Sequence, residues 1–235
     1  MAQHLSRART PKNWPIQRKQ TKWITRVNPG THPLERSLNL NLVIKELLKY
    51  AQTTREVKRI LNEGKVLVDK KIRKDPKFPV GIMDLIEIPE TKECYRLMVN
   101  EQTKFVLIPV DESRQALKPC KIIGKTTIKG GKTQLNLFDS KNLLTNDKKL
   151  QVGDTVILNV ETNQITTHLK LEKNSYVYLI SGKHAGTTGV ITEIHEEKNM
   201  NKSRITLETK QGTMETLKEY AFVIDPKLIE NGKSE

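Results

Sequence analysis

The first regular pattern of apolar and polar residues in this 235-residue chain begins near residue 37. Leucine, valine and isoleucine recur at helical spacing between Leu38 and Leu48, which predicts an amphipathic helix from about Asn41 to Tyr50. Residues 1–33 show neither helical spacing nor alternation, and they contain four prolines. These residues are therefore predicted to form an extended N-terminal arm.

A second helix is predicted between residues 53 and 64. Thr53 or Thr54 is suited to cap its start, and Glu56 lies in the first turn, where the helix dipole favours an acid. Gly64 is suited to the left-handed position that ends many helices. One face of this helix is predicted to be apolar and is formed by Val57, Ile60 and Leu61.

Short strands are predicted for most of the chain after this helix. Val66–Val68 is followed by an apparent tight turn at Asp69-Lys70, and Met83–Ile88 is the next strand. Gly130-Gly131 between two alternating runs indicates a hairpin, whereas Asn142–Leu150 is polar and is predicted to be a loop or one helical turn. The remaining strands before residue 170 are predicted at 95–99, 105–110, 121–128, 133–138, 155–160 and 164–169.

The last part of the chain begins with an apolar run at Tyr176–Ile180, followed by Gly182, Gly186 and Gly189. Glycines after a strand raise the possibility of a phosphate-binding loop, but both common nucleotide-binding motifs open a helix. Here the glycines lead into the β-branched run Val190-Ile191-Thr192, so they are predicted to serve a strand-loop-strand turn. Further strands are predicted at 204–209, 214–217 and 222–224.

Positive charge is concentrated at the start of the chain. Residues 1–80 contain 19 Lys and Arg against 6 Asp and Glu, residues 81–159 contain 12 against 10, and residues 160–235 contain 10 against 11. A general solubility surface would spread its charge along the chain. The first third therefore indicates a localised surface that binds a polyanion.

Two stretches carry this excess charge. In the N-terminal arm the cations are interleaved with Trp14 and Trp23, the only two tryptophans, which suits phosphate contact combined with base stacking; a disordered solubilising tail is the alternative. The arm cations are Arg7, Arg9, Lys12, Arg18, Lys19, Lys22 and Arg26, with Arg36 shortly after. The second stretch, Thr53–Arg73, contributes Arg55, Lys58, Arg59, Lys65, Lys70, Lys71 and Arg73. Charge on a single helix is most often a solvated face, but its continuation beyond Gly64 favours a binding surface.

Residue types that support catalysis or metal binding are scattered. Cys94 and Cys120 have no CxxC partner, which argues against a zinc site or a disulfide framework and favours a reducing cytoplasm. The five histidines, at positions 4, 32, 168, 184 and 195, show no metal-binding or catalytic spacing. No apolar run approaches 18 residues, and the N-terminus lacks the apolar core of a signal peptide. The sequence predicts a soluble protein that is not an enzyme, with no cofactor, metal, membrane segment or small-molecule substrate.

These residues carry a resemblance to a known family. Residues 40–88, and above all Thr53–Arg73, resemble the S4 RNA-binding domain, which bacterial ribosomal protein S4 shares with RNA-modifying enzymes. Tyr178–Glu193 resembles a KOW motif with its three turn glycines. The order of these units, with strings such as HLSRARTPKNWPI (4–16), PGTHPLERSL (29–38) and REVKRILNEGKVLVD (55–69), is similar to that of the archaeal and eukaryotic small-subunit ribosomal protein family S4e.

The resemblance implies an α+β, multi-domain architecture. The expected parts are a basic extended arm at 1–36, an S4-like domain at 37–92, a central β-barrel-like domain at 93–170, an SH3-like KOW barrel at 171–225 and a tail at 226–235. The family usually has Asp-Gly where this chain has Asp69-Lys70, which leaves the type of this turn open. The arm of the family usually reads His-Leu-Lys-Arg, whereas here Ser6-Arg7 follows His4-Leu5.

The resemblance also implies a function, namely a structural constituent of the small (30S) subunit in the cytoplasmic ribosome. Its expected partners are 16S-type ribosomal RNA and neighbouring small-subunit proteins, with one copy per ribosome. Lys183 and His184 in the KOW loop are candidates for a further phosphate contact, and a simple exposed turn is an equal alternative. An RNA-modifying enzyme that uses the same S4 domain and a KOW-type transcription elongation factor are the competing hypotheses.

Overall fold

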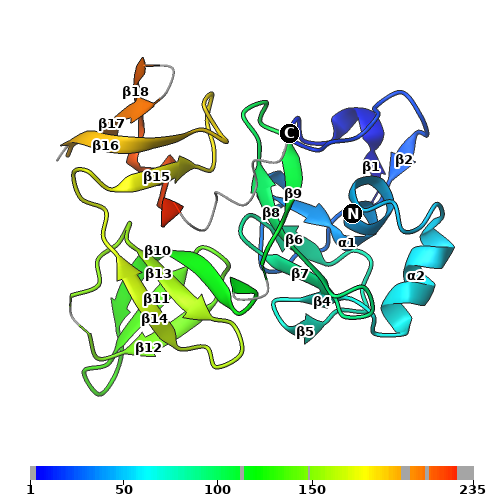
Figure 1. The fold of residues 1–235 in the computed structure, drawn as a ribbon, viewed down its shortest axis with the longest axis horizontal. Coiled ribbons are helices and arrows are strands. Elements are labelled where there is room, and N and C mark those ends of the chain that lie inside the picture. The colour runs from blue at the N-terminus through cyan, green and yellow to red at the C-terminus, as the bar shows by residue number, and fades with distance from the viewer. Residues whose placement is uncertain (1–3, 112–113, 148, 197–201, 210–211, 227–235) are drawn as a thin grey trace. The chain divides into compact units, whose positions relative to one another are not determined.

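The computed structural model describes residues 4–111, 114–147, 149–196, 202–209 and 212–226 (Figure 1). The chain divides into two compact units. The first unit comprises Met1–Val99 and Lys104–Gln115, and the second comprises Asn100–Thr103 and Ala116–Glu235. The described residues are mostly β with few helices, and most of their strands belong to three five-stranded antiparallel sheets.

The N-terminal segment is folded onto the first unit, so the prediction of an extended arm is wrong. β1 (Leu5–Ser6) pairs with β2 (Trp23–Ile24), and a 3-10 turn at Arg7–Arg9 follows β1. Trp14 has no exposed surface, and the backbone N–H of Phe105 donates to the carbonyl of Asn13 at 3.0 Å. A tryptophan buries more apolar area than most side chains, so its burial fixes the path of the surrounding segment.

A buried histidine holds the end of this segment. The Nε2 atom of His32 lies 3.1 Å from a carboxylate oxygen of Asp84, and both side chains are almost fully enclosed. The imidazole ring lies directly over Gly81, where a Cβ atom would come within 2.3 Å of it. Glycine is therefore required at position 81 for the histidine to reach its partner.

The first helical region is shorter than predicted. β3 (Ser37–Asn39) pairs with β6 (Pro79–Gly81), and the side chain of Asn39 then caps α1 (Leu40–Leu42) by accepting the N–H of Leu42 at 2.8 Å. A π-helical segment, Val43–Leu47, continues α1. The predicted end at Tyr50 is wrong because Lys49 takes a positive φ of 58°, which breaks the helix.

The second helix, α2 (Thr54–Asn62), confirms the predicted caps. The hydroxyl of Thr53 accepts the N–H of Glu56, and the Glu56 carboxylate reaches back to the N–H of Thr53, which completes a capping box. Gly64 has φ +76°, the left-handed conformation expected after the helix. Val57 and Leu61 are fully buried and attach the helix to the first unit.

The capping box gives a stability prediction. Thr53→Ala removes the acceptor for the Glu56 N–H and should lower the free energy of unfolding of the first unit by about 1 kcal/mol. Thr53→Ser keeps the hydroxyl and is the matched control. Thermal unfolding of the two variants measures the difference. An equal loss in both would show that the threonine methyl group, and not the cap, stabilises the helix.

The same box predicts a pH dependence. The pKa of the Glu56 carboxyl lies below its ordinary value of 4.5, chiefly because it accepts the backbone N–H of Gln52 and, next, through its contacts with Thr53. Because this pKa is lower in the folded than in the unfolded protein, the ionised Glu56 carboxylate stabilises the fold at a pH above the pKa of the unfolded state. This stabilisation is lost as the pH falls through the pKa of the folded state. Glu56→Gln keeps the capping geometry and should remove this part of the acid sensitivity.

The turn at Asp69-Lys70 joins β4 (Leu67–Val68) to β5 (Lys71–Ile72). Asp69 has φ +52° and Lys70 has φ +59°, and two successive positive φ values define a type I′ turn. Asparagine and glycine favour this turn, and a lysine adopts it with some strain. The Lys70 ammonium, 3.0 Å from the carboxylate of Glu87, holds the side chain over the sheet. The turn therefore has the type I′ geometry that favours glycine at its second central position, although this chain has Lys70 at that position.

The sheet of the first unit extends beyond the predicted domain boundary. Its strand order is β5-β4-β7-β8-β9, with β7 at Leu85–Ile88, β8 at Glu93–Val99 and β9 at Phe105–Pro109. β8 pairs directly with β7 along four residues, so this sheet continues past the boundary predicted between residues 92 and 93, which stays a prediction. The strands predicted at 95–99 and 105–110 are β8 and β9 of this sheet, in the first unit.

The central sheet of the second unit has the order β12-β11-β10-β13-β14. Its strands are β10 (Leu117–Thr127), β11 (Thr133–Leu137), β12 (Asn142–Thr145), β13 (Thr155–Asn159) and β14 (Ile165–Leu169). The predicted loop at Asn142–Leu150 is partly wrong, because its first residues pair with β11 despite their polarity. Cys120, Ile122, Leu135, Leu137, Val156 and Leu158 form most of the core beside this sheet.

The last sheet has the order β18-β17-β16-β15-β19. Its strands are β15 (Tyr176–Leu179), β16 (Thr188–His195), β17 (Arg204–Thr209), β18 (Gly212–Leu217) and β19 (Ala221–Val223). Gly182 and Gly186 have φ near +90° in the connection between β15 and β16, which confirms the predicted strand-loop-strand turn. At Gly189 a Cβ atom would lie 2.7 Å from the carbonyl oxygen of Glu208 on the next strand, so the close approach excludes any side chain.

Candidate nucleic-acid interface

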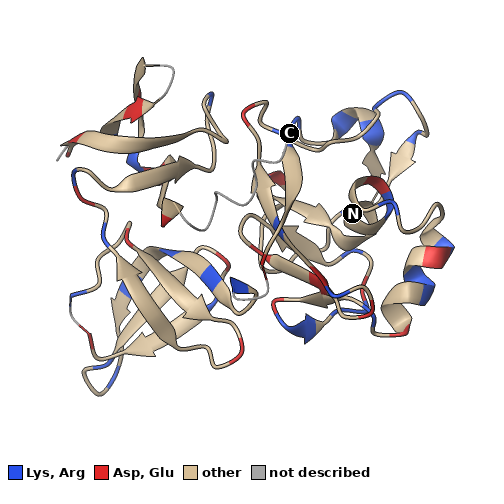
Figure 2. Cartoon of the chain, viewed as in Figure 1, with Lys and Arg blue, Asp and Glu red and all other residues tan. Residues whose placement is uncertain are grey.

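Three cations lie on the solvent face of α2. Arg55, Lys58 and Arg59 are all exposed, because the helical period places them away from the buried Val57 and Leu61. Arg59 contacts Glu63, with Nε 3.0 Å from Oε1, and its side chain is still 84% exposed. Figure 2 shows Lys and Arg on α2 and along the loops of the N-terminal segment. The helix thus presents a short row of positive charge on a rigid support.

Two of the cations after α2 form ion pairs with carboxylates of the first unit. The Lys65 ammonium lies 2.8 Å from Glu63 and 3.2 Å from Glu90, and Lys70 pairs with Glu87. Lys65, followed by Arg59, holds the pKa of the Glu63 carboxyl below its ordinary value. The Lys65 pairs are partly exposed and contribute only about 0–1 kcal/mol, so a phosphate can compete for this cation, whereas Lys70 faces the buried carboxylate of Glu87 and is held more firmly.

Two further cations complete this part of the surface. Lys71 is exposed on β5. The Arg73 guanidinium lies over the ring of Phe78 at 4.3 Å from its centroid, which orients the side chain without neutralising its charge. Lys49 and Lys74 are also exposed in the first unit, and the sequence reasoning missed both. Lys74 could have been included from the sequence, because it follows Arg73 directly.

The N-terminal segment divides into structural and exposed cations. Arg7 is 5% exposed, donates to the carbonyl of Gln17 at 2.9 Å and lies 3.7 Å from Glu46, and Arg18 donates to three backbone carbonyls of residues 8–11. The prediction of Arg7 as a phosphate contact is therefore wrong, as is that of Trp14, because neither side chain is accessible. The exposed cations of the segment are Arg9, Lys12, Lys19, Lys22 and Arg26.

Trp23 differs from Trp14 in being available. Its side chain is 53% exposed, the ring of His4 lies 5.5 Å away at an angle of 48°, and the Lys22 ammonium lies 5.1 Å from its centroid. An exposed indole beside a cation is the arrangement on which unpaired bases stack. Trp23 is therefore the candidate stacking residue of this segment.

The remaining predicted contacts, Arg36, Lys183 and His184, lie outside α2 and its turn. Arg36 is half-buried in the first unit. Lys183 and His184 lie in the second unit, in the loop between β15 and β16, where Lys183 is exposed and His184 is half-buried. The carbonyl of His184 accepts the hydroxyl of Thr187 at 2.7 Å, so this residue also shapes the loop.

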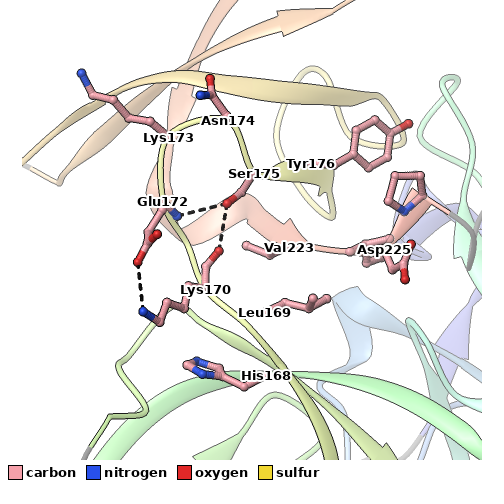
Figure 3. A pocket seen from close by; sticks show the side chains of 12 residues that line it. His168, Leu169, Lys170, Glu172, Lys173, Asn174, Ser175, Tyr176, Val223 and Asp225 are labelled. Atoms are coloured by element: carbon pink, nitrogen blue, oxygen red, sulfur yellow. Dashed lines mark hydrogen bonds and ion pairs between the residues drawn. The ribbon is translucent and has the colours of Figure 1, made fainter.

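A hollow of about 410 Å³ lies in the second unit between residues 168–176 and 223–226 (Figure 3). Three of its polar residues contact one another: Lys170 is 3.4 Å from the Glu172 carboxylate, and the Ser175 hydroxyl donates to the carbonyl of Lys170. His168 contacts Asp154 at 2.7 Å. Within the described ranges, no group of three or more potential ligand side chains could hold a metal ion.

No helix in the described part of the chain has the length and apolar character needed to cross a bilayer. The chain matches four family descriptions in succession. The model of the RS4NT (NUC023) domain matches residues 1–35, and that of the S4 domain matches residues 43–86. The model of the ribosomal family S4e matches residues 91–165, and that of the KOW motif matches residues 173–208. The matches therefore follow the chain from its start into β17.

Curated relatives match nearly the whole chain. The small ribosomal subunit protein eS4 of Methanothermobacter thermautotrophicus is 43% identical over 94% of this chain and 91% of its own length. The protein of the same name from Aeropyrum pernix is 38% identical over 91% and 88%. The crystal structure of the 30S ribosomal protein S4e from Thermoplasma acidophilum has a TM-score of 0.70 and 32% identity, and covers 82% of this chain and 97% of that one.

Proposed function

Because the chain belongs to the eS4 family of small-subunit ribosomal proteins, we propose that the exposed cations of its first unit bind phosphates of 16S-type ribosomal RNA. The protein is a structural constituent of the small ribosomal subunit, and its S4 domain binds RNA. The observation that carries the proposal is the row of exposed cations at Arg55, Lys58 and Arg59 on a helix whose opposite face is buried.

The proposed surface combines α2, the following turn and the N-terminal segment. Folded RNA is recognised mainly through its shape, its phosphates and its 2′-hydroxyls, because the major groove of A-form RNA is too narrow for side chains. Lysine and arginine on rigid elements suit this mode, and Trp23 adds one stacking surface. The proposed contacts are Arg9, Lys12, Lys19, Lys22, Trp23, Arg26, Arg55, Lys58, Arg59, Lys65, Lys70, Lys71 and Arg73. The contacts predicted at Arg18, Arg36, Lys183 and His184 stay predictions.

Further details of the proposal follow from family membership. The family is a structural one and not an enzyme family, and we infer that this chain has no catalytic role. We also infer a single copy in the cytoplasmic ribosome, in contact with neighbouring small-subunit proteins. The two five-stranded sheets of the second unit support a central β-barrel-like domain and an SH3-like KOW barrel.

The two competing hypotheses have no support. The four family matches extend from residue 1 to residue 208, and the curated relatives are named as ribosomal proteins. Copurification with RNA polymerase would have favoured an elongation factor, and modified nucleotides in incubated RNA would have favoured an enzyme. The direct test of the ribosomal function is the salt dependence of binding to small-subunit ribosomal RNA, because it counts the phosphates neutralised.

A further inference from the structure

The tip of the β10–β11 hairpin, residues 128–132, extends beyond the last strand pair of the central sheet. Thr127 and Thr133 form the last strand pair, and the N–H of Ile128 donates to the carbonyl of Lys132 at 2.9 Å. Gly130 and Gly131 have φ values of +85° and +72°, and no atom would lie within 4 Å of a Cβ atom at either position. The four residues 129–132 are therefore open to solvent.

Positive charge is concentrated at this tip. Residues 122–138 contain Lys125, Lys129 and Lys132 and no acidic residue. All three lysines are exposed, and the ammonium of Lys125 donates to the carbonyl of Leu150 at 2.9 Å. Lys129 and Lys132 flank the two glycines directly. Asp147 is exposed in the connection that follows β12, the strand beside β11, and it is accompanied there by the exposed Lys149.

Earlier lysines of the same strand have a different role. Lys118 is almost completely buried and lies 3.1 Å from a carboxylate oxygen of Asp139. The ammonium of Lys121 donates to the backbone carbonyls of Lys218, Glu219 and Ala221 at 2.5–3.3 Å. These two cations stabilise the fold of the second unit. The comparison shows that lysine on β10 is used internally near the start of the strand and is left to solvent at the hairpin.

Three exposed cations elsewhere in the second unit face carboxylates. Lys170 lies 3.4 Å from Glu172, Lys202 lies 3.0 Å from Glu219, and Arg204 lies 3.2 Å from Glu215. Among the described residues, Lys129 and Lys132 have no carboxylate within ion-pair distance. Two uncompensated charges on a projecting tip give a strong local positive potential.

We propose that Lys129 and Lys132 form a second RNA contact, on the central domain, in which the two ammonium groups bind the phosphodiester backbone. This inference rests on the proposed RNA-binding function and adds a site outside the N-terminal segment and the S4 domain. The bare glycine backbone allows the tip to approach RNA closely. A protein-binding surface would require an apolar centre, which the tip lacks because it is lysine and glycine around the half-buried Ile128.

The test is a salt titration of the full-length chain with small-subunit ribosomal RNA. Each lost phosphate contact makes the slope of log affinity against log salt shallower by about 0.7–0.9. Lys129→Ala/Lys132→Ala should therefore shift the slope by about 1.5 and weaken binding roughly 20-fold near 0.15 M salt. Lys129→Arg/Lys132→Arg retains both charges and should keep the wild-type slope.

A matched control removes the same charge from paired positions of the same unit. Lys202→Ala/Arg204→Ala should leave the slope unchanged, because the proposed contact is confined to the hairpin tip and does not include these two cations. A wild-type slope in Lys129→Ala/Lys132→Ala would overturn this inference and leave the proposed function intact. Loss of binding to a small-subunit protein, with the RNA slope unchanged, would overturn it in favour of a protein contact. A shallow slope in the wild type would instead contradict the proposed function.

Discussion

The variant Arg55→Glu/Lys58→Glu/Arg59→Glu is expected to bind small-subunit ribosomal RNA at least about 100-fold more weakly than the wild type near 0.15 M salt. Each phosphate contact is worth about a factor of five at this salt concentration, and three lost contacts multiply to about 100 before any repulsion from the new acids. The three side chains are exposed and make few contacts within the protein. Filter binding or sedimentation with small subunits measures the loss.

The same variant should remain folded. A glutamate at position 55 lies in the first turn of α2, where the helix dipole favours it, whereas one at position 59 faces Glu63 and costs about 0.2–0.5 kcal/mol. A matched control, Lys173→Glu/Lys202→Glu/Arg204→Glu, makes the same change of charge in the second unit. Equal loss of binding in the control would attribute the effect to net charge. Unfolding of the α2 variant would show that these residues are structural.

Replacement of the buried tryptophan should have the largest effect on stability. Trp14→Ala is expected to lower the free energy of unfolding of the first unit by about 3–5 kcal/mol, because it leaves a large cavity under the N-terminal segment. Trp23→Ala is the matched surface control and should change stability by less than about 0.5 kcal/mol. Chemical denaturation measures both. A small effect of Trp14→Ala would mean that the segment is not packed on the first unit in solution.

The two tryptophan variants also distinguish a residue that packs in the core from one that contacts RNA. Removal of one stacked base costs about 1–3 kcal/mol of binding free energy, so Trp23→Ala should weaken RNA binding about 5- to 150-fold. Added RNA should quench the fluorescence of Trp23, because it is exposed, and should leave that of the buried Trp14 unchanged. Quenching that persists unchanged in Trp23→Ala would contradict this assignment.

Local signals in the sequence predicted the local structure well. The caps of α2, the left-handed Gly64 and the hairpin at Gly130-Gly131 depend on residues within a few positions of one another. The folded N-terminal segment depends on distant partners, such as the hydrogen bond between Asn13 and Phe105 and the pair of His32 and Asp84. No periodicity within residues 1–33 records those partners, so the segment resembled a free arm.

For the candidate site, too, the local features could be predicted from the sequence and the tertiary contacts could not. Which cations are exposed on α2 follows from the helical period and the apolar face. The ion pairs of Lys70 with Glu87 and of Lys65 with Glu90 arise because the strand and turn beyond residue 84 return beside β4. The burial of Arg7 likewise requires Glu46 from the first helical region. Charge counting identified the surface, and tertiary contacts decided which cations belong to it.

The most direct measurement of the central claim is the affinity of the purified wild-type chain for small-subunit ribosomal RNA across a series of salt concentrations. Neutralisation of six to eight phosphates predicts a slope of log affinity against log salt of roughly −4 to −7. A slope shallower than about −2 would contradict the account, because the exposed cations of the first unit would then not be its principal RNA contacts.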